Sequence, residues 1–150
     1  MNTSTVRESG LRAVMVGALL VTSAISISLV QADEKAEQTL IPATSVAIWQ
    51  SIDHEAAALA RTIESGKLAD VHHHAFAIRD LVAALPAHSA SLPADKLAAV
   101  KASGKFVATL AERLDSSGDA KDKAATASNF KTLQGLLKSL RENYPSLVAK

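Results

Sequence analysis

The chain has 150 residues, of which 16 are Lys or Arg and 15 are Asp or Glu, and it contains no cysteine. Residues 1–32 carry two arginines and one glutamate, so residues 33–150 hold 14 basic and 14 acidic groups. This balance lacks the basic excess that a nucleic-acid binder needs to neutralise phosphates. The absence of cysteine excludes disulfides, thiolate metal sites and c-type haem attachment. One domain is expected at this length.

The first 32 residues have the order of a secretory signal. A polar start with Arg7 and Arg12 is followed by an uncharged apolar run over 13–30 and by small residues before a cleavage site at Ala32. The alternative is a retained anchor helix, but this run is at the short limit of what spans a bilayer. We therefore expect a cleavable signal helix over 1–32, no stable membrane anchor, and a periplasmic or secreted bacterial protein. A flexible lead over 33–42 would follow.

Four amphipathic segments fill the rest of the chain, with proline and glycine between them. They cover residues 43–65, 68–85, 93–116 and 119–144. Apolar residues recur every three or four positions, which is the spacing of a helix with one buried face. Because short connections place neighbouring helices antiparallel, the sequence predicts an all-α, up-down-up-down antiparallel four-helix bundle over 43–150.

The predicted core consists of one apolar stripe from each segment, with Trp49 as an anchor at its edge. Asp119 is the expected N-cap of the last helix. Gly104 occupies a core position, where glycine costs about 1 kcal/mol relative to alanine. It either makes room for the His74 imidazole or a small ligand, or allows two helices to approach closely. The stripes are Ile48, Ile52, Ala56, Leu59 and Ile63; Val71, Ala75, Ile78, Val82 and Leu85; Leu97, Val100, Gly104, Val107, Ala111 and Leu114; and Thr126, Phe130, Leu133, Leu137, Leu140 and Tyr144.

Three consecutive histidines, His72, His73 and His74, are the main candidates for a binding site. Neighbouring residues of a helix point about 100° apart, so the three rings cannot all bind one ion. Asp70 precedes His73 by three residues and His74 by four, a spacing that places side chains on one face. One interpretation is a site for Cu(II), Zn(II) or Ni(II) on these residues, completed by water or another chain. In the other, His72 and His73 are surface residues and His74 is bonded to Asp70.

Several other chemistries lack the residues they require. Met1 and Met15 are the only methionines and leave with the signal, so no Met/His haem site is expected. A di-iron bundle needs two Glu-x-x-His motifs, and the chain has a single Asp-x-x-His. Neither a glycine-rich phosphate loop nor a G-x-S-x-G motif occurs. We therefore predict that the protein is not an enzyme. His54 is expected to be exposed, and His88 lies in a loop without further ligands.

A metal-free protein–protein interaction module is the competing interpretation. Phe76, Phe106 and Leu110 fall outside the main apolar stripes of their segments. Apolar residues that are not needed for the core favour a surface that binds a partner. Such a module would bind another periplasmic protein or form a homodimer.

Three stretches carry a resemblance to known proteins: LADVHHHAFAIRDLVAALP over 68–86, KFVATLAERLD over 105–115, and the closing Asn143-Tyr144-Pro145. They resemble a group of small exported bacterial helical proteins, similar in build to periplasmic four-helix bundles involved in heavy-metal response. The resemblance covers about residues 49–145. It implies that the histidines at 72–74 are the residues to test, and it carries over no catalytic residue. The chain departs from soft-metal sites in lacking Cys and, after residue 32, Met.

Overall fold

The computed structural model describes residues 38–144, which form an all-helical structure without a β-strand in this range. The all-α prediction is therefore confirmed. The predicted signal over 1–32, residues 33–37 of the predicted lead and the C-terminal 145–150 lie outside the described residues. In chain order the helices are α1 (Ser45–Glu64), the 3-10 helix η1 (Leu68–Asp70), α2 (Val71–Ala84), the 3-10 helix η2 (Leu85–His88), α3 (Ala94–Asp119) and α4 (Lys123–Arg141).

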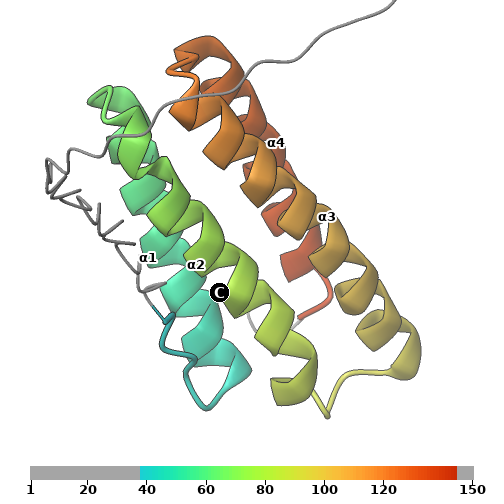
Figure 1. The fold of residues 1–150 in the computed structure, drawn as a ribbon. Helices are drawn as coiled ribbons and strands as arrows, with labels where there is room; N and C mark the ends of the chain where they lie inside the picture. Colours follow the sequence, from blue (N-terminus) through green and yellow to red (C-terminus); the bar gives the residue numbers. More distant parts are fainter. Residues whose placement is uncertain (1–37, 145–150) are drawn as a thin grey trace, which may run out of the picture. The chain divides into compact units, whose positions relative to one another are not determined.

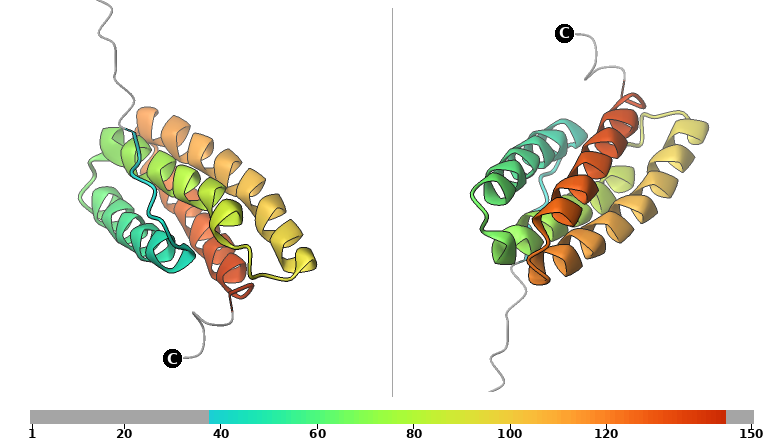
Figure 2. Two further views of the ribbon diagram at one scale, coloured as in Figure 1. Left: turned by 90° about the horizontal axis from the view of Figure 1, so that it is seen from below. Right: turned by 90° about the horizontal axis from the view of Figure 1, so that it is seen from above.

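The four α-helices lie side by side, and each helix contacts the next one along the chain (Figure 1). The last helix, α4, packs mainly on α3 and less extensively on α1. Views from below and from above show α1 and α4 close together (Figure 2). The first and last helices therefore share the interior with α2 and α3, and the contact between α1 and α4 is the less extensive one.

Side-chain caps explain where two of the helices begin. The Thr44 hydroxyl accepts a hydrogen bond from the backbone N–H of Ala47 at the start of α1, at 3.2 Å. At the start of α4 the Asp122 carboxylate accepts from the N–H of Ala125 at 2.9 Å. The expectation that Asp119 caps the last helix is wrong, because Asp119 is the final residue of α3. α3 is longer than predicted because its last turns, including Gly118, are buried against η1.

The core is mainly aliphatic, and the predicted stripes supply most of it. In α1 the stripe residues Ile48, Ile52, Leu59 and Ile63 are all at most 5% exposed. Three stripe residues of α1 and α3 are only half-buried: Ala56, Leu97 and Gly104. Within residues 38–144, no helix is both long and apolar enough to span a membrane.

Gly104 has no close neighbour. A Cβ placed there would meet only Val82 Cγ1, at 4.0 Å, which is an ordinary contact. Its nearest side chain therefore belongs to Val82 and not to His74, and the backbones do not approach tightly at this point. Neither interpretation of Gly104 from the sequence is supported.

Gly118 is the glycine that the packing requires. The predicted segments 93–116 and 119–144 place Gly118 in the break between two helices, but it is buried inside α3. A Cβ at this position would lie 2.6 Å from the carbonyl oxygen of Leu68 and 3.3 Å from Val71 Cβ. The absence of a side chain therefore allows α3 to lie directly against the backbone of η1.

A small aromatic cluster holds the end of α4 onto α1. The buried rings of Trp49 and Tyr144 meet edge to face, with centroids 5.7 Å apart. The Tyr144 hydroxyl lies 2.9 Å from Ser89 Oγ, and the Arg141 guanidinium lies 4.5 Å above the Trp49 ring while it pairs with Asp53. Burial raises the pKa of Tyr144, and the hydrogen bond with Ser89 opposes that shift. Trp49 is thus a buried anchor rather than one at the edge of the core.

Candidate functional site

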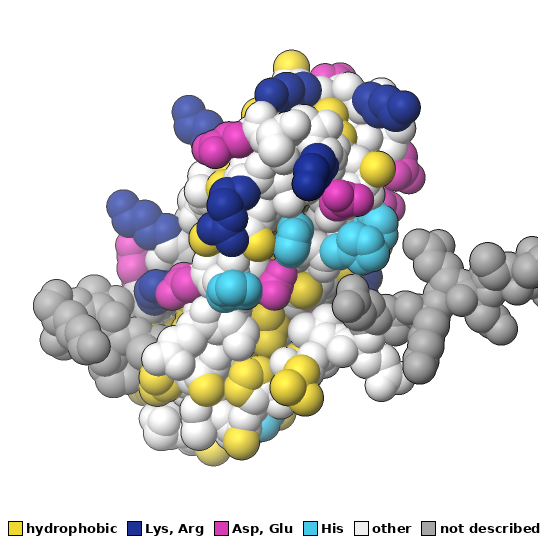
Figure 3. Space-filling model, turned by 90° about the vertical axis from the view of Figure 1, so that its left-hand side faces the viewer, with side chains coloured by type: hydrophobic (Ala, Val, Ile, Leu, Met, Phe, Trp, Pro, Cys, Tyr) yellow, Lys and Arg dark blue, Asp and Glu magenta, His cyan; other side chains and the backbone are white. Residues whose placement is uncertain are grey.

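Histidine side chains gather on the face formed by α1 and α2, with carboxylates beside them (Figure 3). His74 Nδ1 lies 2.8 Å from Glu55 Oε2 of α1, and the two side chains are 28% and 26% exposed. The carboxylate that bonds to His74 therefore comes from the neighbouring helix. The prediction that this partner is Asp70 is wrong, because spacing along one helix does not reveal what the adjacent helix presents.

The other members of the predicted metal set lie at or before the start of α2. Asp70 is the last residue of η1 and is exposed, as is His73, whereas His72 is half-buried. The rings of His72 and His73 have centroids 3.9 Å apart, and His72 Nδ1 lies 2.7 Å from the carbonyl oxygen of Ala69. Among residues 38–144, no group of three or more His, Asp or Glu side chains is arranged to hold a metal ion. The four predicted residues are therefore not brought together into one ligand set.

The two remaining histidines are His54 of α1 and His88 of η2. His54 is exposed on α1, as predicted. His88 Nδ1 lies 3.0 Å from the carbonyl oxygen of Ala43, so it connects η2 to the segment before α1. The same segment is tied to α2 by Thr39, whose hydroxyl donates to Asp80 at 3.3 Å.

A hollow of about 440 Å³ lies between α3 and α4, and we call it the α3–α4 groove. Its apolar lining is Phe106 and Leu110 from α3 with Gly135 and Leu136 from α4. Phe106 is 64% exposed, whereas Leu110 is buried. A Cβ at Gly135 would meet no atom within 4 Å, so this glycine leaves the groove open without serving the packing of the fold.

Arg113 lies where the α3–α4 groove meets a second hollow of about 490 Å³, since it lines both of them together with Thr109. The second hollow is polar, with Glu112, Ser116 and Asp122 among its lining residues. No carboxylate of residues 38–144 forms a salt bridge with the Arg113 guanidinium. The apolar α3–α4 groove and the polar hollow therefore adjoin at Arg113, which places a cation between them.

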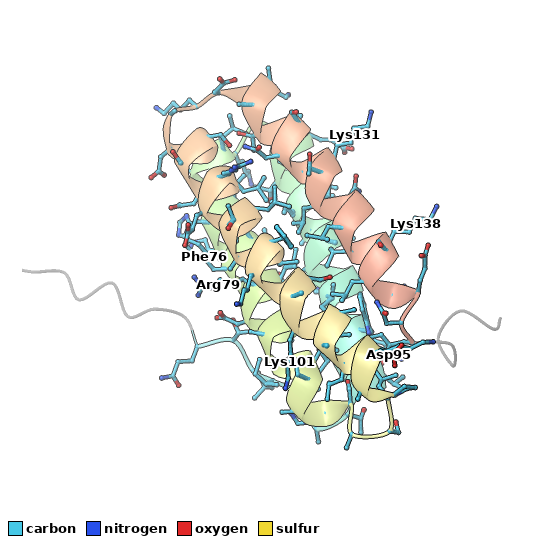
Figure 4. The ribbon with its side chains drawn as sticks, turned by 90° about the vertical axis from the view of Figure 1, so that its right-hand side faces the viewer. Phe76, Arg79, Asp95, Lys101, Lys131 and Lys138 are labelled. Carbon is cyan, nitrogen blue, oxygen red and sulfur yellow. The ribbon has the colours of Figure 1, made fainter. Side chains whose placement is uncertain are left out.

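Phe76 does not belong to this surface. It is half-buried on α2, and the Arg79 guanidinium lies 4.5 Å from the centre of its ring (Figure 4). It does not line the α3–α4 groove. The predicted patch of Phe76, Phe106 and Leu110 is therefore corrected to one exposed aromatic, Phe106, over a groove that α4 completes.

No protein-family model, curated protein or solved structure matches the chain. The face that holds His74 and Glu55 and the α3–α4 groove are therefore the two features that bear on its function. Sequence reasoning missed Glu55, Arg113, Gly135 and Leu136. Only Gly135 gave a signal, since a glycine in the middle of a helix costs about 1 kcal/mol relative to alanine without an evident turn to justify it.

Proposed function

We propose that this protein is an exported, non-enzymatic binding module, an antiparallel four-helix bundle that recognises a protein partner through the α3–α4 groove. The single observation that carries the proposal is the exposed Phe106 beside an open, largely apolar hollow. Export is proposed from the signal pattern of residues 1–32.

The energetics of the groove favour a binding role over a structural one. Gly135 weakens α4, and no tight contact requires a glycine there. Phe106 leaves most of its ring in water, although burying an aromatic ring is strongly favourable. Both features lower the stability of the isolated chain, and both would be compensated when a partner fills the groove. Departures of this kind from local stability are expected at functional sites.

Site-specific photo-crosslinking in cells that produce the protein tests this proposal. A photoreactive residue at position 109, on the edge of the groove, is expected to give one discrete adduct with another protein. The matched control is position 46 on α1. Val46 is 47% exposed and does not line the groove. Filling the groove with Gly135→Leu is expected to abolish the adduct from position 109. Equal adducts from both positions, or an adduct that survives Gly135→Leu, would contradict the proposal.

A second candidate function, binding of a divalent transition metal, is favoured by the pair of Glu55 and His74. When Nδ1–H of His74 donates to Glu55, the lone pair on Nε2 is free to bind a metal. A carboxylate that orients a histidine in this way is a common outer-shell partner of metal ligands. Since the described residues provide no set of three ligands, the proposed ion would take its other ligands from water or from a second molecule.

Calorimetric titration with Cu(II), Zn(II) and Ni(II) above neutral pH tests the metal candidate. We expect micromolar binding that disappears in His74→Ala and weakens about tenfold in Glu55→Gln, because the imidazole loses its orienting partner. His54→Ala is the control and should bind normally. Binding that persists in His74→Ala would exclude this site.

A further inference from the structure

We infer that the partner of the α3–α4 groove is an acidic amphipathic helix. This inference rests on the proposed function and adds to it the chemistry of the partner. It is carried by two independent properties of the surface, namely its shape and its charge.

The shape of the groove fits a helix. It runs between two neighbouring helices, with Leu110 and Leu136 along it and Phe106 on the α3 side. The open space above Gly135 can receive an apolar side chain from an approaching helix. Amphipathic helices bind in this manner, with their apolar face laid into a groove between helices. A flat bilayer surface would leave the hollow at Gly135 empty.

The charge of the surface selects an acidic partner. α4 carries four basic side chains, Lys123, Lys131, Lys138 and Arg141, and no acidic one. Arg141 is paired with Asp53, but no carboxylate of residues 38–144 forms a salt bridge with Lys131 or Lys138, which project from α4 into solvent (Figure 4).

Arg113, which forms no salt bridge with a carboxylate in the described part of the chain, adds a further cation to the lining of the groove. The acidic side chains near it, Glu112 and Asp122, line the polar hollow and not the apolar groove. A partner helix with carboxylates flanking its apolar face would therefore find complementary charges beside the groove, on α4 and at Arg113.

The same charges argue against a second copy of this chain as the occupant. Two copies that met through this face would bring the basic residues of one α4 close to those of the other. Like charges across an interface oppose association. An apolar groove flanked by cations is therefore complementary to an acidic helix and not to itself.

The test uses three fluorescently labelled synthetic peptides of about 18 residues, or five helical turns. They share one leucine-rich apolar face and carry Glu, Gln or Lys beside it. Fluorescence anisotropy with the purified protein is expected to show the Glu peptide binding at least about tenfold more tightly than the Lys peptide. This difference should shrink at high salt.

Variants of the protein test which residues form the site. Gly135→Leu and, separately, Phe106→Ala are each expected to weaken binding of the Glu peptide about tenfold. Lys131→Glu combined with Lys138→Glu should reverse the preference, and Val46→Ala should change nothing. Circular dichroism verifies that each variant is folded.

The alternative outcomes separate the failure of this inference from the failure of the proposed function. If the Gln or Lys peptide binds as tightly as the Glu peptide and Gly135→Leu still prevents binding, the groove is a binding site but the acidic partner is wrong. If no peptide binds, the inference is overturned, and the crosslinking experiment decides separately on the groove. Self-association in sedimentation that Gly135→Leu abolishes would overturn it in favour of a second copy. Binding to phosphatidylglycerol vesicles without binding of the Glu peptide would overturn it in favour of a membrane.

Discussion

Replacing Gly118 with alanine is expected to lower the free energy of unfolding by about 2–3 kcal/mol. The new Cβ would lie 2.6 Å from the carbonyl oxygen of Leu68 and 3.3 Å from Val71 Cβ. The first of these atoms belongs to the backbone, so no change of rotamer can move it away. Either η1 must shift with the start of α2, or the last turn of α3 must move. Urea unfolding followed by circular dichroism measures the loss.

Two other glycines provide matched controls for Gly118→Ala, because they lie in helices without a close neighbour. A Cβ at Gly104 meets Val82 at 4.0 Å, and a Cβ at Gly135 meets nothing within 4 Å. Alanine at either position is expected to raise the free energy of unfolding by up to about 1 kcal/mol, since alanine favours the helix. A Gly118→Ala protein as stable as either control would show that the contact between α3 and η1 is loose.

Replacing Tyr144 with alanine is expected to lower the free energy of unfolding by about 3–5 kcal/mol. The Tyr144 ring is 4% exposed and meets Trp49 edge to face, and its hydroxyl lies 2.9 Å from Ser89 Oγ. Losing the ring would leave a cavity at the place where α4 closes onto α1, a contact that is less extensive than the one between α4 and α3. Trp49 is the single tryptophan, so its fluorescence reports on this cluster directly. We expect its emission to shift to longer wavelength as water reaches the indole.

Tyr144→Phe separates the ring from the hydroxyl. It is expected to cost only about 1 kcal/mol, because Ser89 retains its hydrogen bond to the carbonyl oxygen of Leu85 at 2.6 Å. Burial raises the pKa of Tyr144 above 10.0 in the folded protein. The protonated ring therefore contributes stability that is fully present below pH 10 and is lost as the pH rises through the raised pKa. Tyr144→Phe should remove this alkaline loss. Retention of the same pH dependence in the variant would assign it to another group.

The helical class, the approximate extent of each helix and most of the core could be predicted from sequence patterns. These properties follow from local chemistry, because apolar residues spaced by three and four define one face of a helix whatever lies next to it. The exposure of His54 and the burial of Ile48, Ile52 and Leu59 could be predicted for this reason. The proposed export signal also rests on local sequence alone.

The way in which the helices meet, and with it the candidate sites, could be seen only in the folded chain. The pairing of Glu55 with His74, the tight contact at Gly118 and the open hollow at Gly135 all depend on how one helix is rotated and shifted against its neighbour. Spacing within a helix does not contain this information, so it predicts Asp70 as the partner of His74 and gives no sign of the close contact at Gly118. The physical reason is that the burial of an apolar stripe is nearly indifferent to small rotations and shifts of a helix, whereas a hydrogen bond or a backbone contact is fixed to fractions of an ångström.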